Sequence, residues 1–213
     1  MYRFSSLFLM ACLFFSPVCL SQETRSEFLA LYREAIEGGN TSRVVELLDT
    51  AIGSKDELVS GEAKVHTYLF YRTHKAVDKE LALQYLRDIS ASDYCHFRQI
   101  AFFYLAEEET DGFSKNEFSP SALNGLKISA SLGVRQAARV LMDYYFKSER
   151  YSDSYFWLMV YSKMVNKGTI GYEMAISLEE KLLNHLEAND LKEIRLSMDE
   201  RLGEISQCVE LSK

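Results

Sequence analysis

Apolar residues along this chain recur three and four positions apart, and no stretch alternates strictly between apolar and polar side chains. The first pattern is typical of helices that bury one face, whereas half-buried strands show the second. Turn-forming clusters interrupt the pattern at short intervals, for example at residues 38–41 and 53–56. The chain therefore reads as a series of helices joined by turns.

The pattern predicts an all-α fold, an α/α solenoid of about four to five stacked antiparallel helix hairpins. The expected helices cover 23–37 and 41–52, 58–72 and 78–90, 94–108 and 120–131, 134–148 and 152–166, and 170–186 and 190–208. Pro120 starts one of them, where its missing N–H costs nothing. The connection from Glu107 to Ser119 is longer than the others and is acidic and polar.

A helix-start pattern recurs within residues 78–86, 121–126 and 153–158, and its equivalent positions Ala82, Ala122 and Ser154 are 40 and then 32 residues apart. Such hairpins are too thin to bury their own apolar faces, so neighbours must stack. Small and aromatic residues recur on the faces that would meet. The residues expected to pack between repeats are Ala63, Tyr71, Ala82, Tyr85, Tyr104, Ala122, Gly133, Ala137, Leu141, Tyr145 and Trp157.

The N-terminus has the pattern of a secretory signal peptide. Arg3 precedes a largely apolar run, Pro17 follows it, and Cys19 and Ser21 are small residues suited to cleavage before residue 22. The run is too short for a membrane span, which needs about 20 residues. A lipoprotein signal ending at Cys12 is an alternative.

The expected organisation is a signal peptide over residues 1–21, an N-terminal helical hairpin over 22–56, and helical repeats with closing helices over 57–213. After cleavage no integral membrane span is expected. Cys95 and Cys208 would then be the remaining cysteines. Because solenoid repeats contact only near neighbours, we expect both to be free thiols.

The charge of the chain argues against nucleic acid as a partner. It has 31 acidic and 24 basic side chains and a formal net charge of −7. Binding to a phosphate backbone requires clustered Lys and Arg. No nucleic-acid partner is therefore expected.

Residues 131–168 carry a further pattern, with Leu132-Gly133, Asp153, Trp157-Leu158 and Gly168 in order. This resembles the Sel1-like repeats, a subclass of the tetratricopeptide-type α/α solenoids, and the resemblance covers about residues 58–200. It implies a superhelical array that binds a protein partner and has no catalytic residues. It does not identify the partner or the oligomeric state.

No catalytic or metal-binding motif was found. The four histidines form no H-E-x-x-H arrangement, and the acidic segment 107–112 lacks the alternating ligands of a calcium loop. No Ser or Cys nucleophile signature is present. We expect no enzyme activity, no cofactor and no metal.

Aromatic residues are concentrated between positions 144 and 172. Tyr144, Tyr151 and Tyr155 fall off the repeat-packing face and would anchor a partner if exposed. Their alternative role is to cover the seam between hairpins. The neighbouring charged residues Arg135, Arg139 and Asp143 recur at four-residue spacing and are candidates to line the same groove, or to make ordinary surface pairs.

These observations predict an exported, non-catalytic adaptor that presents a helical-repeat groove to a protein partner, in a bacterial periplasm. One alternative is a helical-repeat enzyme or enzyme module acting on cell-envelope polymer, which requires carboxylates that converge in a pocket. Another is a lipid-anchored component of an envelope complex.

Overall fold

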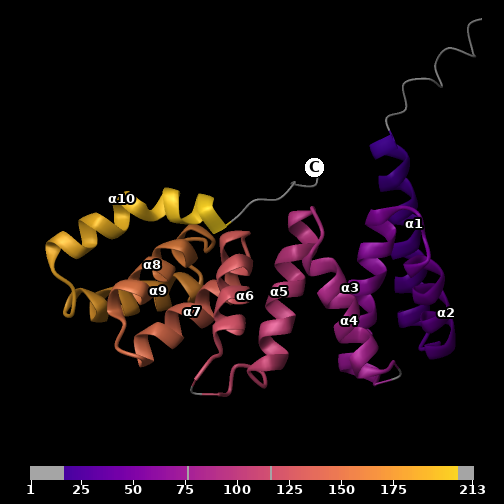
Figure 1. Ribbon diagram of the computed structural model, residues 1–213, viewed down its shortest axis with the longest axis horizontal. Helices are drawn as coiled ribbons and strands as arrows, with labels where there is room; N and C mark the ends of the chain where they lie inside the picture. Colours follow the sequence, from indigo (N-terminus) through magenta and orange to yellow (C-terminus); the bar gives the residue numbers. More distant parts are fainter. Residues whose placement is uncertain (1–16, 76, 116, 206–213) are drawn as a thin grey trace, which may run out of the picture. The chain divides into compact units, whose positions relative to one another are not determined.

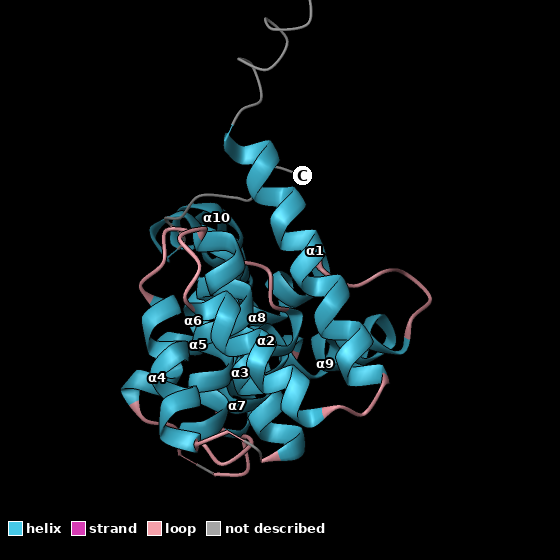
Figure 2. Cartoon of the chain, turned by 90° about the vertical axis from the view of Figure 1, so that its right-hand side faces the viewer, coloured by secondary structure: helices cyan, strands magenta, loops and turns pink. Residues whose placement is uncertain are grey.

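The computed structural model describes residues 17–75, 77–115 and 117–205, and every regular element in these ranges is an α-helix (Figures 1 and 2). The helices are α1 Pro17–Glu37, α2 Thr41–Ile52, α3 Glu57–His74, α4 Lys79–Ser90, α5 Cys95–Glu109, α6 Pro120–Ser131, α7 Arg135–Lys147, α8 Tyr151–Lys163, α9 Ile170–Leu183 and α10 Ala188–Ile205. The predicted all-α hairpin fold is confirmed. Helix α1 begins at Pro17 instead of residue 23, so it takes in the last residues of the predicted signal peptide. The rest of that segment lies outside the described residues.

Side-chain caps fix where several helices begin. Asn40 accepts a hydrogen bond from the Arg43 N–H at the start of α2, and Ser119 accepts one from Ala122 at the start of α6. Asp56 caps α3 and Thr169 caps α9 in the same way. Each cap satisfies a backbone donor that the helix itself leaves without an acceptor.

The chain divides into two compact units, residues 1–85 and 86–213. In the first unit α1 packs against α2 and α3, and α2 packs against α3. Their contacts bury Phe28, Val44, Leu48, Ala63 and Phe70. The unit extends beyond residue 56, where the N-terminal hairpin was expected to end, because α3 packs against both preceding helices.

In the second unit, helices α5 to α9 pack each against the next along the chain. Figure 1 shows α5, α6 and α7 side by side in sequence order. Helix α10 then returns to contact α8 and α6. Consecutive packing of this kind is the arrangement of an α/α solenoid.

Most residues expected to pack between repeats are buried. Ala63, Ala82, Ala122, Ala137, Leu141, Tyr145 and Trp157 are at most 2% exposed, whereas Tyr71, Tyr85 and Tyr104 are half-buried. Gly133 is exposed and has a φ of +103°, so it serves the turn after α6 and makes no repeat contact of the expected kind.

Small residues let α6 approach α5 closely. A Cβ atom added to Gly125 would lie 3.2 Å from the carbonyl oxygen of Phe102, which is tighter than an ordinary van der Waals contact. One turn further along α6, the Ser129 hydroxyl donates a hydrogen bond of 2.7 Å to the carbonyl oxygen of Gln99. The α5–α6 pair is therefore held at close range by backbone contacts.

Candidate functional site

A cavity of about 460 Å³ lies in the second unit, between one face of α7 and the long connection that follows α5. We call it the α7 cavity. Its walls are formed by Glu107, Gly112, Phe113, Ser114, Lys115, Phe118, Gln136, Arg139, Val140, Asp143, Tyr144, Lys147 and Ser148. The volume is within the range of ligand-binding pockets, about 300–1,000 Å³.

Helix α7 and its C-cap residue Ser148 contribute to the cavity a row of side chains three and four positions apart, beginning with Gln136 and Arg139. The opposite face of α7 is buried. Its residues Ala137, Ala138, Leu141, Met142 and Tyr145 are at most 1% exposed. Helix α7 is thus fixed in position by its packed face, and its polar face is left to line the cavity.

The connection after α5 forms the other wall, and a left-handed turn shapes it. Asp111, Gly112 and Phe113 have φ values of +53°, +69° and +65°. Phe113 is a bulky residue in a conformation that costs backbone strain, of order 1–3 kcal/mol. The buried Thr110 supports the turn, since its hydroxyl donates to the Ala106 carbonyl at 2.6 Å and accepts from the Phe113 N–H at 3.3 Å.

A chain of aromatic rings holds this connection against the helices. Phe113 contacts Phe103 of α5, with ring centroids 5.5 Å apart, and Phe118 at 6.2 Å. Phe118 in turn stacks on Tyr144 of α7 at 4.5 Å. These ring contacts compensate for the strained backbone and give the cavity an aromatic wall.

The polar wall carries charges of both signs. Lys115, Arg139 and Lys147 are cationic, and Glu107 and Asp143 are acidic. The Nε atom of Arg139 is buried and has no hydrogen-bond partner among the described residues.

The pKa of Asp143 is raised by desolvation, and the positive charges of Arg139 and Lys147 oppose this shift. More than a third of the Asp143 surface is exposed. A carboxyl that faces the cavity accounts for both its raised pKa and its exposure, because the walls displace part of its hydration water and leave the group accessible.

Three of the six candidate residues from the sequence, Arg139, Asp143 and Tyr144, lie together in the α7 cavity. Arg135 is exposed at the first position of α7 and does not line the cavity. Tyr151 stacks on His185 with ring centroids 4.1 Å apart and is half-buried.

Tyr155 was expected to contribute to an exposed aromatic surface, and that expectation is wrong. The residue is 1% exposed, because α8 packs against α7, α9 and α10 and buries residues on most of its circumference. Its hydroxyl accepts a hydrogen bond from Arg195 at 3.0 Å and donates one to Glu179 at 3.4 Å. A smaller cavity of about 290 Å³ adjoins this network, which links three helices.

The sequence did not single out Phe113, Lys115, Phe118, Gln136 or Lys147 as site residues. Two signals pointed toward them. The connection from Glu107 to Ser119 is unusually long, and Lys147 continues the four-residue spacing of Arg139 and Asp143. Long connections without regular structure are often functional.

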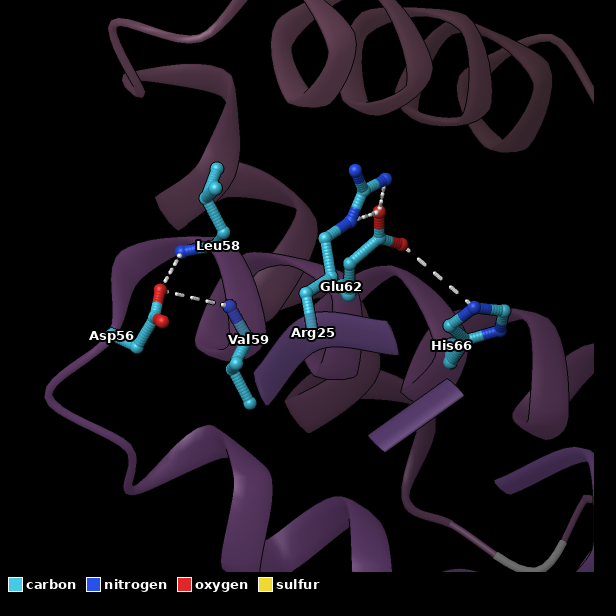
Figure 3. A network of polar contacts seen from close by, with 6 residues as sticks. All are labelled: Arg25, Asp56, Leu58, Val59, Glu62 and His66. Atoms are coloured by element: carbon cyan, nitrogen blue, oxygen red, sulfur yellow. Dashed lines mark hydrogen bonds and ion pairs between the residues drawn. The ribbon is translucent and has the colours of Figure 1, made fainter. Parts of the chain in front are cut away.

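The first unit contains a separate polar cluster (Figure 3). Glu62 of α3 is 4% exposed and forms an ion pair with Arg25 of α1, whose Nε donates to it at 2.7 Å. His66 approaches the other carboxylate oxygen at 3.8 Å and packs against the Tyr32 ring, with centroids 4.5 Å apart. These contacts join α1 to α3, and a buried carboxylate needs such partners.

Cys95 is disulfide-bonded, so the expectation of a free thiol is wrong. Its partner cysteine lies outside the side chains that the structure describes. The expectation assumed that solenoid repeats contact only their near neighbours. That rule does not limit the contacts of a segment outside the stacked helices.

Within the described ranges, no group of His, Cys, Asp or Glu side chains is arranged to hold a metal ion. No helix described in the structure combines the length and apolar character required to cross a membrane.

Comparisons with protein-family models, with curated proteins and with solved structures gave no match. The resemblance to Sel1-like repeats therefore remains a prediction, and the interpretation of the site rests on its geometry.

Proposed function

We propose that this chain is an exported, non-catalytic protein-binding scaffold of the bacterial periplasm, and that the α7 cavity receives a segment of its protein partner. The observation that carries the proposal is the composition of this cavity. The aromatic side chains of Phe113, Phe118 and Tyr144 line this cavity together with charged side chains from successive turns of α7. Aromatic and Arg side chains are the residues that most often anchor protein interfaces.

The packing of α7 supports this use. One face of the helix is held by buried residues such as Ala137 and Leu141, so the side chains of the other face project from a fixed frame. A site that is formed before its ligand arrives loses less conformational entropy on binding.

Two features support export. The N-terminal 21 residues have the pattern of a signal peptide. The disulfide at Cys95 suits an oxidising compartment, because cytosolic thiols are generally kept reduced. Cys12, where a lipid anchor would be attached, lies outside the described residues.

A second candidate function is hydrolysis of a cell-envelope polymer. Glu107 and Asp143 line the same cavity, and burial raises the pKa of Asp143, as suits a general acid. Against this role, Arg139 and Lys147 act on Asp143 in the opposite direction and favour its ionised form. We therefore place the scaffold role first.

The test of the scaffold role is chemical crosslinking in envelope extract of the source cells, followed by identification of captured proteins. The full chain is compared with R139Q/K147Q, which removes two cavity charges, and with R135Q, which removes a charge from the same helix outside the cavity. We expect one partner to be captured by the wild type and R135Q and lost in R139Q/K147Q. Circular dichroism establishes that all three are equally helical.

Equal capture by all three proteins would reject the cavity as the binding site. The enzyme candidate is tested separately with E107Q and D143N. Release of soluble fragments from purified envelope polymer by the wild type, abolished in both variants, would replace the scaffold role with hydrolysis.

A further inference from the structure

The charge of the α7 cavity is opposite in sign to that of the whole chain. The chain has a formal net charge of −7, whereas the cavity wall carries three cationic and two acidic side chains. A local excess of positive charge on an acidic protein favours an anionic ligand at that place.

Arg139 is the cation best suited to bind such a ligand. Its buried Nε atom has no hydrogen-bond partner among the described residues, so no protein acceptor there holds the guanidinium. A planar guanidinium matches the two oxygens of a carboxylate. Lys147, two turns along α7, lines the same wall and adds a second positive charge.

The backbone N–H groups of residues 111–115 are not available to bind the anion. Five successive N–H groups already donate within the turn: Asp111 to Glu108, Gly112 to Glu107, Phe113 to the Thr110 hydroxyl, Ser114 to Asp111 and Lys115 to Thr110. Chain-terminal carboxylates are commonly captured by free backbone N–H groups in a nest. Residues 111–115 provide no such nest, so we assign recognition of the anion to side chains.

Part of the remaining lining is apolar. Phe118 and Tyr144 form a stacked pair beside Val140, and together they present ring and methyl surface next to the charged row of α7. A ligand that fills the cavity therefore needs an apolar group close to its anionic group.

We infer that the α7 cavity recognises an Asp or Glu side chain of the partner protein, paired with Arg139, together with an adjacent apolar side chain packed on Phe118 and Tyr144. This inference rests on the proposed scaffold function and specifies the chemistry of the segment that is bound.

The test uses defined peptides titrated into the isotopically labelled full chain and followed by nuclear magnetic resonance. The probe is acetyl-Ser-Phe-Glu-Phe-Ser-amide. The first control replaces its Glu by Gln, and the second is the same Gln peptide with a free C-terminal carboxylate. We expect the Glu peptide to bind about tenfold more tightly than the blocked Gln peptide, the size of effect typical of one charged hydrogen-bonded pair. Amide signals of Phe118 and Tyr144 should shift.

Variants of the chain distinguish charge from fold. R139Q should remove most of the preference for Glu, and R139K should retain part of it, because Lys keeps the charge but lacks the planar fork. D143N should tighten binding of the Glu peptide by about threefold, since a like charge is removed. R135Q should bind as the wild type does.

Three results would overturn the inference: equal affinity for the Glu and blocked Gln peptides, weaker binding of the Glu peptide by D143N, or equally tight binding of the free-acid Gln peptide. Absence of binding at millimolar peptide would overturn it as well. The scaffold role fails separately. If capture of a partner depends on Arg139 and Lys147 but the Glu peptide is not preferred, the scaffold role is supported and this inference is rejected. If the Glu peptide is preferred but no partner is captured, the ligand chemistry of the cavity is supported and the scaffold role is rejected.

Discussion

Phe118 stacks on Tyr144 with ring centroids 4.5 Å apart and planes inclined by only 14°. One ring belongs to the long connection after α5 and the other to α7, so the contact closes the α7 cavity on one side. It is also the end of the series of rings that begins at Phe103 and holds the strained Phe113. The position of the connection therefore depends on this stack.

Replacing Phe118 by Ala should loosen the connection. Loss of a half-buried aromatic pair should cost about 1–2 kcal/mol in the free energy of unfolding. Trypsin should then cleave after Lys115 several times faster than in the wild type. Y151A is the matched control, because it removes a similar stack on His185 elsewhere in the unit. Equal cleavage rates in F118A and the wild type would contradict a role of this stack in holding the connection.

Replacing Tyr155 separates its hydrogen bonds from its packing. Y155F removes the contacts to Arg195 and Glu179 and should cost about 1 kcal/mol. Y155A also empties a fully buried position between helices and should cost about 3–5 kcal/mol. Urea denaturation followed by circular dichroism measures both. If Y155A cost no more than Y155F, Tyr155 would not be a core residue.

The disulfide at Cys95 leads to a covalent prediction. If residues 1–21 are removed on export, Cys208 is the remaining cysteine, and peptide mapping without reductant should find Cys95 linked to it. Closing so long a loop should contribute about 2–5 kcal/mol to stability, and C95S, C208S and the double variant should lose equal amounts. A linkage from Cys95 to Cys12 or Cys19 would instead show that the N-terminal segment is retained.

Asp143 should make the stability of the second unit depend on pH. Because its pKa is raised in the folded chain, the unfolded chain ionises at lower pH, and Asp143 lowers stability as the pH rises through this interval. D143N should therefore melt at a higher temperature than the wild type at pH 7. The difference should vanish below about pH 3, where the carboxyl is almost fully protonated in both states. D93N, at an exposed position between helices of the same unit, is the control. A lower melting temperature for D143N at pH 7 would mean that Arg139 and Lys147 outweigh desolvation.

The parts of the fold that the sequence predicted correctly are those that depend on local interactions. The spacing of apolar residues and caps such as Asn40 and Ser119 depend on neighbours within one helical turn, and the predicted helices match the observed ones closely. The burial of Tyr155 depends on α10 lying over α8, a contact between segments far apart in sequence. Spacing along one helix gives no information on such a contact, so Tyr155 was wrongly placed on the surface.

The helices, their turns and the unusual length of the connection after α5 could be read from the sequence, because each follows from side-chain periodicity and local hydrogen bonding. Which polar residues share a site depends instead on tertiary packing. Arg139, Asp143 and Tyr144 were visible as neighbours on one helix, but Phe113, Lys115 and Phe118 join them only because aromatic contacts fold the connection back onto α7. A cavity needs two walls, and here the second wall is positioned by packing between segments that are distant in the chain.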